Sequence, residues 1–371
     1  RWWHNVVWLP SRGCTGMSGI ARKMMSAVGV RDETATVAYV ASDNADSITS
    51  IDISDPSNLS ELDSLSNANL DVARGVALDL TNQVAYVTSL SGDRITSIDI
   101  SDPSNLTELD SLSNANLEGA YGIALDLTNE VAYVASGSAD SITSIDISDP
   151  SNLTELDSLS NANLDRVFDI ALDLTNEVAY VASNSGSITS IDLSDPSNLT
   201  ELDSLSNANL IGAFGVALDL TNEVAYVVSS FTNSITSIDI SDPNSLTELD
   251  SLSNANLNGA NGIDLDLTNQ VAYVVSRIAD SITSIDISDP NSLTELDSLS
   301  NANLEGAFSV ALDLTNQVAY VASSSADSIT SIDLSDPNSL TELDSLSNAN
   351  LNGANGIALN IPGPASTNAY E

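Results

Sequence analysis

The chain has 371 residues, with 52 acidic and 9 basic side chains and a formal net charge of −43. Nucleic acids and anionic membranes are bound through basic patches, so this charge balance argues against both as partners. No apolar run approaches the roughly 18 residues that a membrane-spanning helix needs, and the single cysteine, Cys14, leaves no partner for a disulfide bond within the chain.

Residues 1–36 differ in kind from the rest of the chain. They hold all three Trp, all three Met and five of the nine basic residues. An aromatic, cationic segment beside an acidic body is expected to dock on a protein surface, either its own or that of a second copy. The alternative is a remnant of a gene boundary. The residues expected to mediate assembly are Trp2, Trp3, Trp8, Arg22 and Lys23.

From Val37 onward the chain repeats one unit of about 47 residues. The tetrapeptide Val-Ala-Tyr-Val occurs seven times, at steps of 47 residues with one step of 46. Such a period indicates a repeat array with one continuous core, rather than the separate domains that the length alone suggests. We therefore divide the chain into the segment 1–36, the repeat array 37–361 and a tail at 362–371.

Each unit carries four strand patterns, as its third copy illustrates. Runs rich in β-branched residues predict strands at 131–136 and 141–148, a more polar outer strand follows at 154–160, and an apolar inner strand lies at 169–174. Turns such as Asp-Pro-Ser-Asn at 149–152 join them. Four strands with tight turns in this length describe a propeller blade. The predicted fold is all-β, a seven-bladed β-propeller of four-stranded antiparallel blades.

Two segments compete to close the predicted ring. The last inner strand, 356–361, has no strand after it and can complete the first blade beside 37–40. Residues 26–34 look like a degenerate inner strand for the same place. If they occupied it, the C-terminal strand would be free to complete a neighbouring molecule. We favour closure by the C-terminal strand, because propellers are normally closed.

The third strand and its turn resemble a known family. Residues 142–153, Ile-Thr-Ser-Ile-Asp-Ile-Ser-Asp-Pro-Ser-Asn-Leu, are similar to the LVIVD-repeat propellers, in which an aliphatic-Val-Asp strand precedes a Ser-Asp-Pro turn. The resemblance covers 37–361, with Thr and Ser at some aliphatic positions of the motif. It implies the propeller fold and a secreted or surface-anchored bacterial or archaeal protein, and it implies no particular ligand.

The units differ from one another mainly in two loops that should share one face of the ring. In an antiparallel blade, the loop between the second and third strands lies on the same face as the connection to the next inner strand. The turns on the opposite face are nearly constant. Seven variable positions are expected around the mouth of the central channel: Arg74, Tyr121, Phe168, Phe214, Asn261, Phe308 and Asn355.

This variable face is the predicted binding face. All four Phe and every Arg after residue 36 lie in the variable loops, and both types are enriched at binding hot spots. Relaxed drift in loops that do not pack is the alternative explanation. The predicted binding residues are Arg74, Arg94, Tyr121, Arg166, Phe168, Phe214, Phe231, Arg277 and Phe308.

Two features of the constant turns could carry ligands or modifications. The recurring Asp146 and Asp149 are weak Ca²⁺ candidates, although turn formation also accounts for Asp there and no calcium-loop motif is present. We expect no other cofactor. Asn-Leu-Thr and Asn-Leu-Ser sequences fit glycosylation acceptors, again with turn chemistry as the alternative. The candidate acceptors are Asn58, Asn105, Asn152 and Asn198.

The sequence favours binding over catalysis. Residues 37–371 contain no His, Cys or Lys, and no catalytic carboxylate pair can be selected among so many acids. We interpret the chain as a non-enzymatic extracellular or cell-surface scaffold that binds or adheres to a protein partner. One alternative is a self-assembling subunit, a homo-oligomer or filament joined by the N-terminal segment or by strand exchange. The other is a propeller hydrolase or lyase.

Overall fold

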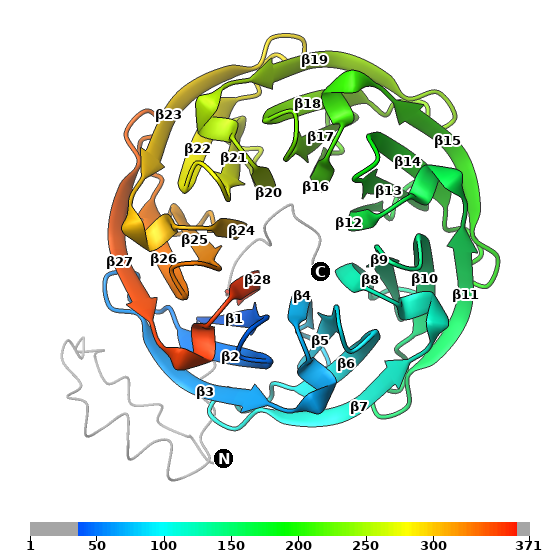
Figure 1. The fold of residues 1–371 in the computed structure, drawn as a ribbon, viewed down its shortest axis with the longest axis vertical. Helices are drawn as coiled ribbons and strands as arrows, with labels where there is room; N and C mark the ends of the chain where they lie inside the picture. Colours follow the sequence, from blue (N-terminus) through cyan, green and yellow to red (C-terminus); the bar gives the residue numbers. More distant parts are fainter. Residues whose placement is uncertain (1–35, 362–371) are drawn as a thin grey trace, which may run out of the picture. The chain divides into compact units, whose positions relative to one another are not determined.

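The computed structural model describes residues 36–361, which form a ring of seven four-stranded antiparallel sheets around a central channel (Figure 1). The predicted seven-bladed β-propeller is therefore confirmed. Among these residues, no helix has the length and apolar character needed to cross a lipid bilayer. The inner strands are β4 (Ala73–Asp79), β8 (Ala120–Asp126), β12 (Val167–Asp173), β16 (Ala213–Asp219), β20 (Ala260–Asp266), β24 (Ala307–Asp313) and β28 (Ala354–Asn360).

The remaining strands follow the chain outward within each blade. The second strands are β1 (Val37–Ser42), β5 (Val84–Ser89), β9 (Val131–Ser136), β13 (Val178–Ser183), β17 (Val224–Ser229), β21 (Val271–Ser276) and β25 (Val318–Ser323). The third strands are β2 (Ser47–Asp52), β6 (Arg94–Asp99), β10 (Ser141–Asp146), β14 (Ser187–Asp192), β18 (Ser234–Asp239), β22 (Ser281–Asp286) and β26 (Ser328–Asp333). The outer strands are β3 (Ser60–Ser66), β7 (Thr107–Ser113), β11 (Thr154–Ser160), β15 (Thr200–Ser206), β19 (Thr247–Ser253), β23 (Thr294–Ser300) and β27 (Thr341–Ser347).

One turn of 3₁₀ helix leads from each outer strand to the next inner strand. In every copy, an Asn side chain caps this turn by accepting a hydrogen bond from a backbone N–H two residues later, such as Asn114 from Asn116 at 2.9 Å. The turns are η1 (Ala68–Leu70), η2 (Ala115–Leu117), η3 (Ala162–Leu164), η4 (Ala208–Leu210), η5 (Ala255–Leu257), η6 (Ala302–Leu304) and η7 (Ala349–Leu351).

The C-terminal strand closes the ring. Strand β28 pairs with β1 in the sheet order β28-β1-β2-β3, with Val37 opposite Asn360 and Val40 opposite Ile357. Closure by this strand, which we favoured, is confirmed. The competing segment, 26–34, lies outside the described residues. Because the first blade combines both ends of the array, hydrogen bonds between distant parts of the chain hold the ring together.

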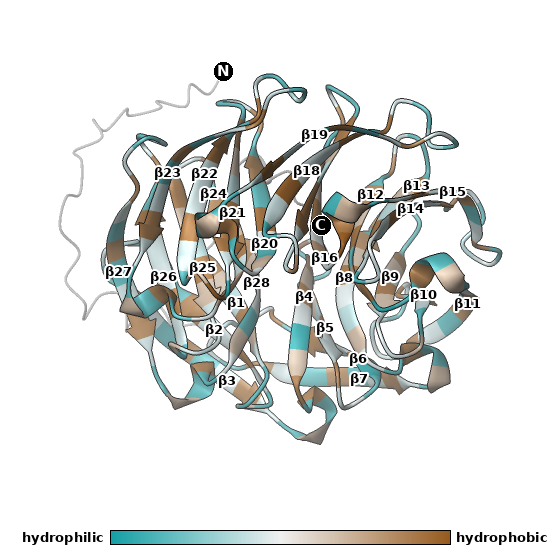
Figure 2. Ribbon diagram, turned by 45° about the horizontal axis from the view of Figure 1, so that its top comes forward, coloured by the Kyte–Doolittle hydropathy of each residue, from teal (hydrophilic) through white to brown (hydrophobic). Residues whose placement is uncertain are grey.

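The apolar core lies between the blades, and the Val-Ala-Tyr-Val strands supply much of it. Tyr226 is 1% exposed and packs in one cluster with Leu257 and Ile263 of the next blade. Burial raises the pKa of this tyrosine, followed by a smaller effect of Asp219. Hydrophobic and hydrophilic residues both occur along the strands (Figure 2), and all six residues of every second strand are buried. Each blade therefore needs its neighbour to bury its apolar face, which explains the near-identity of the copies.

Polar contacts join the blades at their outer edges. Glu155 accepts hydrogen bonds from Asn114 at 2.7 Å and from Asn116 at 2.8 Å, both in the preceding connection. The carboxylate of Asp110 accepts the backbone N–H of Leu153 in the next blade at 2.8 Å. Equivalent contacts recur around the ring, for example Asn207 to Glu248 and Leu246 to Asp203. Many of the acidic residues therefore have structural partners.

Candidate functional site

Each inner strand carries a β-bulge close to its beginning. In blade β16–β19, Ala213 pairs with Ser229 and Gly215 pairs with Val228, so Phe214 between them has no partner on β17. The register shifts at the same point in the other inner strands. A bulge leaves one residue unpaired and re-aims its side chain. The inner strands thus begin two residues earlier than the predicted 169–174 pattern and its equivalents, and the bulges carry Arg74, Tyr121, Phe168, Phe214, Asn261, Phe308 and Asn355.

Glycine follows the bulge in five of the seven inner strands. A Cβ atom at Gly122 would lie 2.6 Å from the carbonyl oxygen of Phe168, and one at Gly215 would lie 2.5 Å from that of Asn261. Neighbouring inner strands approach so closely that a side chain is disfavoured here. The exceptions are Asp169 and Ser309. Asp169 therefore breaks the repeat at a sterically restricted position.

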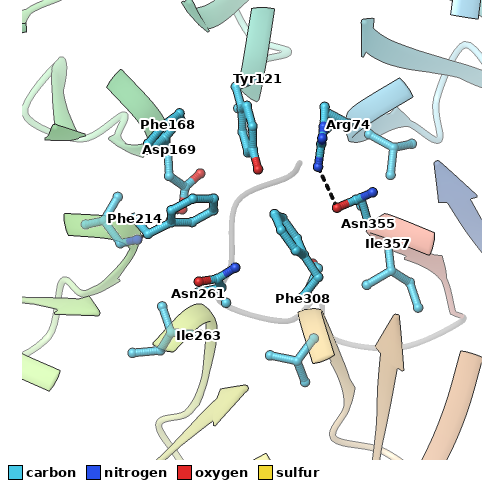
Figure 3. A pocket seen from close by; sticks show the side chains of 18 of the residues that line it. Arg74, Tyr121, Phe168, Asp169, Phe214, Asn261, Ile263, Phe308, Asn355 and Ile357 are labelled. Atoms are coloured by element: carbon cyan, nitrogen blue, oxygen red, sulfur yellow. Dashed lines mark hydrogen bonds between the residues drawn. The ribbon is translucent and has the colours of Figure 1, made fainter. Parts of the chain in front are cut away.

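A pocket at the mouth of the channel is lined by the bulge residues and by the residues just after them (Figure 3). It has an empty volume of about 710 Å³, including space open to solvent. Within residues 36–361, Arg74 and Asp169 are the charged side chains that line it. Two residues beyond the bulges, the lining consists of Val76, Ile170, Val216, Ile263, Val310 and Ile357.

Four aromatic rings, which we call the aromatic side of the pocket, lie around much of its mouth and contact one another (Figure 3). The ring centroids of Phe168 and Phe214 stack at 4.7 Å, and Tyr121 lies 4.9 Å from Phe168 and 5.4 Å from Phe214. Phe308 meets Phe214 edge-on at 5.5 Å. These are the tilted, offset and edge-on geometries that aromatic pairs prefer. These aromatic side chains come from four different blades, so they meet only when the propeller closes.

Arg74 is held from three sides. Its Nη1 donates to Asn355 Oδ1 at 2.8 Å, and its Nη2 lies 3.2 Å from Asp43 Oδ2. The guanidinium lies 5.3 Å from the centroid of Tyr121 and 5.7 Å from that of Phe308, within cation–π range. Its Nε is buried and has no hydrogen-bond partner among the described residues. The cation is thus fixed beside the pocket with one donor unused.

Asp169 is held by the backbone of two blades. Its Oδ1 accepts the N–H of Ile170 at 3.0 Å, and its Oδ2 accepts the N–H of Val216 in the next inner strand at 3.0 Å. Both carboxylate oxygens accept backbone hydrogen bonds, which fix the orientation of this side chain. Figure 3 shows its carboxyl group directed toward the centre of the mouth.

Tyr121 stays protonated beside these two charges. Burial raises the pKa of its hydroxyl; Arg74 and Arg277 oppose this effect, while Asp43 and Asp169 add to it. A protonated hydroxyl can donate a hydrogen bond. Charged, donor and apolar groups therefore meet in one pocket.

The other predicted binding residues lie outside the pocket. Arg94 donates from Nε to the carbonyl of Gly92 at 2.9 Å and from Nη1 to the side chain of Asn69. The guanidinium of Arg166 lies 5.8 Å from the centroid of Phe168. Phe231 is 67% exposed, and Arg277 is exposed. The binding role of the variable face stays a prediction.

The candidate turn sites have structural partners. Asp146 accepts the N–H of Ser148 at 2.9 Å, and hydrogen bonds from Ser148 lower the pKa of this carboxyl. Asp149 accepts the N–H of Ser151 at 2.9 Å. Among residues 36–361, no three His, Cys, Asp or Glu side chains converge in a metal-binding group. Calcium binding stays a prediction.

The remaining candidates are exposed or outside the described residues. The glycosylation candidates Asn58, Asn105, Asn152 and Asn198 are all exposed, and their modification stays a prediction. The five assembly residues, Trp2, Trp3, Trp8, Arg22 and Lys23, lie outside the described residues.

Two acids that break the repeat were not singled out from the sequence. Asp169 replaces glycine, and Asp264 replaces the alanine found in the other six inner strands. Burial raises the pKa of Asp264 to about 8, despite hydrogen bonds from the N–H groups of Leu265 and Leu312. Both replacements are visible when the seven inner-strand sequences are aligned with one another.

Comparison with known proteins gives one family match. The model described as "Lactonase, 7-bladed beta-propeller" matches residues 39–349. A search of curated proteins gave no match. The resemblance to the LVIVD-repeat propellers is therefore wrong. Its strand-and-turn motif reflects turn chemistry, since Asp149 caps its own turn, and not family membership.

Solved structures share the fold at low sequence identity. A protein from Lactobacillus plantarum is 17% identical with a TM-score of 0.74, over 88% of this chain and 99% of that chain. A periplasmic gluconolactonase from Pseudomonas aeruginosa is 11% identical with a TM-score of 0.74, over 89% and 100%. A putative 6-phosphogluconolactonase from Bacteroides fragilis is 11% identical with a TM-score of 0.74, over 88% and 98%.

The family match also overturns the interpretation of function. The interpretation of the chain as a non-enzymatic adhesion scaffold is wrong. The alternative of a self-assembling subunit gains no support. The propeller hydrolase, the third alternative above, is better supported. Absence of His, Cys and Lys did not justify excluding catalysis, because a carboxylate can act as a base and an arginine can stabilise an oxyanion.

Proposed function

The chain belongs to the seven-bladed lactonase family, and we propose that it hydrolyses lactones in the pocket at the channel mouth. The observation that carries this proposal is that one cation and one carboxylate, Arg74 and Asp169, are the charged side chains that line the pocket among the described residues. Opening a lactone needs a group that removes a proton from water and a group that stabilises negative charge on the carbonyl oxygen. The two side chains are suited to these tasks.

Asp169 acts as the general base. Backbone hydrogen bonds from Ile170 and Val216 fix the carboxylate at the lining of the pocket, where a water molecule can meet it. As the water oxygen forms a bond to the lactone carbonyl carbon, its proton passes to the carboxylate. The bond between that carbon and the ring oxygen then breaks, and the proton returns to the leaving alkoxide. The product is a hydroxy acid, and Asp169 is regenerated.

Arg74 stabilises the charge that develops on the carbonyl oxygen. Asp43 and Asn355 fix its guanidinium, so little reorganisation is needed during the reaction. The aromatic surroundings strengthen this role, because an electrostatic interaction gains strength away from water. Asp43 is a positioning residue for the arginine.

The proposal is tested by lactone hydrolysis with the full-length protein. We expect Asp169→Asn to lower kcat by about 10²- to 10⁴-fold, the usual contribution of a general base. Arg74→Gln is expected to cost about 10²- to 10³-fold, as for loss of an oxyanion donor. The matched controls Asp165→Asn and Arg94→Gln, on the same face but outside the pocket, should keep the activity. Unchanged activity in Asp169→Asn would overturn the assignment.

We propose that the protein works outside the cytoplasm. Support comes from the periplasmic gluconolactonase of Pseudomonas aeruginosa, which shares the fold, and from the acidic, Lys-poor composition. Cell fractionation with an antibody against the protein is the test. Recovery in the periplasmic or secreted fraction is expected, and recovery with cytoplasmic markers would contradict the proposal.

A further inference from the structure

We infer that the pocket selects neutral lactones with an aromatic or aliphatic ring or substituent, and that it disfavours polyhydroxylated and phosphorylated sugar lactones. This inference rests on the proposed lactone hydrolysis and adds a substrate class to it. It follows from four properties of the described pocket: its aromatic side, its aliphatic layer, its scarcity of free polar groups and its charge.

The aromatic side offers a surface for a flat or apolar ring. Tyr121, Phe168, Phe214 and Phe308 contact one another at centroid distances of 4.7 to 6.3 Å. Tyr121, Phe168 and Phe214 are only partly buried, whereas Phe308 is 8% exposed. Rings of three blades therefore remain available for stacking or edge contacts with a ligand.

The layer beyond the bulges is aliphatic. Val76, Ile170, Val216, Ile263, Val310 and Ile357 line the pocket there, and each stands two residues after a bulge. These side chains are only 1–5% exposed, and they offer no hydrogen-bonding group to a ligand, so an apolar ring loses its own water against them at no polar cost. Hydroxyl groups placed against the same layer would lose hydrogen bonds to water without replacement.

The amide side chains at the mouth are already engaged. Asn355 accepts from Arg74 and donates from Nδ2 to the carbonyl of Gly353 at 2.6 Å. In the orientation that satisfies its amide, Asn261 donates to the carbonyls of Gly259 at 3.0 Å and Ala260 at 3.2 Å. Both Asn side chains are almost fully buried. Few donors and acceptors remain to replace the hydration shell of a sugar.

The charge of the site opposes a phosphate. A phosphate monoester carries about −1.5 to −2 charges at neutral pH and is usually bound by clustered cations. In the described part of the chain, Arg74 is the cation that lines this pocket, and Asp43 already faces it at 3.2 Å. Asp169 adds a negative charge, and the whole chain has a net charge of −43. A phosphorylated lactone would therefore meet net repulsion.

Three lactones test this inference with the full-length protein: dihydrocoumarin, glucono-δ-lactone and 6-phosphoglucono-δ-lactone. We expect kcat/KM for dihydrocoumarin to exceed that for the neutral sugar lactone at least tenfold and that for the phosphorylated one at least a hundredfold. Equal or higher kcat/KM for either sugar lactone would overturn the inference while leaving lactone hydrolysis intact.

Variants of the aromatic side identify its contribution. Phe214→Ala should lower kcat/KM for dihydrocoumarin about tenfold and leave that for glucono-δ-lactone nearly unchanged. Ile278→Ala is the matched control, since Ile278 is 65% exposed on the same face and does not line the pocket. An equal loss for both substrates in Phe214→Ala would contradict a selective role.

A gain-of-charge variant tests the electrostatic argument. Phe168→Arg places a second cation at a bulge, a position where β4 already accommodates Arg74. The ratio of kcat/KM for 6-phosphoglucono-δ-lactone to that for dihydrocoumarin should rise at least tenfold. No change in this ratio, in a variant with an unchanged unfolding temperature, would contradict the argument.

A binding experiment separates this inference from the proposed function. The lactam 3,4-dihydro-2-quinolinone has the shape of dihydrocoumarin and resists hydrolysis, so calorimetry measures its affinity without turnover. Binding of this lactam in preference to gluconolactam, without hydrolysis of any lactone, would support the pocket preference and overturn the proposed function. Preference for gluconolactam would overturn the inference.

Discussion

The outer edge of the ring is nearly the same in every blade, whereas the mouth of its channel differs from blade to blade. At the outer edge, each blade repeats the same contacts, such as Asn114 to Glu155 and Leu153 to Asp110. At the mouth, seven equivalent bulges carry arginine, tyrosine, phenylalanine and asparagine. Packing and hydrogen bonds with a neighbour explain constancy at the edge. The bulges have no strand partner to satisfy, so they are free to differ, and the proposed chemistry lies where the sevenfold pattern is broken.

The strongest way to break this comparison is to open the ring. A chain ending at residue 353 loses β28, which pairs with β1 and contributes Ala354 and Ile357 to the core. We expect cooperative thermal unfolding, followed by circular dichroism, to be lost. A chain ending at residue 361 keeps every described strand and is the control. If the shorter chain unfolds cooperatively at the control's temperature, closure does not hold the ring together.

A second test removes one large residue from the constant core. Tyr226→Ala should lower the free energy of unfolding by about 3–5 kcal/mol, as for other buried aromatic residues, because Tyr226 is 1% exposed between two blades. Leu156→Ala, at a side chain that is 36% exposed, should change it by less than about 1 kcal/mol. Urea unfolding measures both. Similar effects at the two positions would contradict the core assignment.

Asp264 stands where the other six inner strands have alanine, and this difference between blades can be tested through its pH dependence. Burial raises the pKa of this carboxyl to about 8, above the value of about 3.9 expected in the unfolded chain. The neutral form therefore favours the folded state at low pH, and this stability is lost as the pH rises toward 8. Asp264→Ala restores the residue of the other blades and should stabilise the protein by on the order of 3 kcal/mol at pH 9, with a smaller gain at pH 5.

Urea unfolding at pH 5, 7 and 9 measures this effect, with the exposed Asp71→Ala as the control. If Asp264→Ala raises the free energy of unfolding by the same amount at all three pH values, the carboxyl does not titrate as described. A loss of stability at every pH would mean that its hydrogen bonds to Leu265 and Leu312 outweigh the cost of burial.

A smaller effect is expected at the glycine that follows each bulge. Gly122→Ala places a Cβ atom 2.6 Å from the carbonyl oxygen of Phe168, so a strand must shift at a cost of about 1–3 kcal/mol. Ser309→Ala, at the same position of β24, adds no Cβ and should change stability by less than about 0.5 kcal/mol. Thermal unfolding compares them. Equal changes in stability would contradict a steric reason for glycine at this position of the inner strands.

The repeat predicted the fold well because its signals are local. Alternating strands, Asp-Pro turns and a fixed period are sufficient for blade architecture, and the unpaired last strand indicated closure. The bulges were missed because they depend on how neighbouring inner strands meet, as at Gly122 and Phe168, which no single strand pattern reveals. Consequently, the inner strands begin at Ala73 and its equivalents, two residues before the predicted starts.

The candidate site was predicted only in part. Variation between the copies pointed to Arg74, Tyr121, Phe168, Phe214 and Phe308, which line one pocket. It also pointed to Arg94, Arg166, Phe231 and Arg277, which do not line the pocket. Asp169 was missed because acidic residues are common in this chain and its significance depends on its place in the channel. Its hydrogen bond to Val216 joins residues of different blades, a contact that only the folded ring creates.

The most direct test restores the sevenfold pattern at one residue. Asp169→Gly gives β12 the glycine that five other inner strands have at this position. Lactone hydrolysis and thermal unfolding would be measured on the same preparation. We predict that the unfolding temperature is kept or raised while kcat falls at least a hundredfold, the scale of a lost general base. Full activity in a folded Asp169→Gly protein would contradict the claim that the broken symmetry at the channel mouth carries the function.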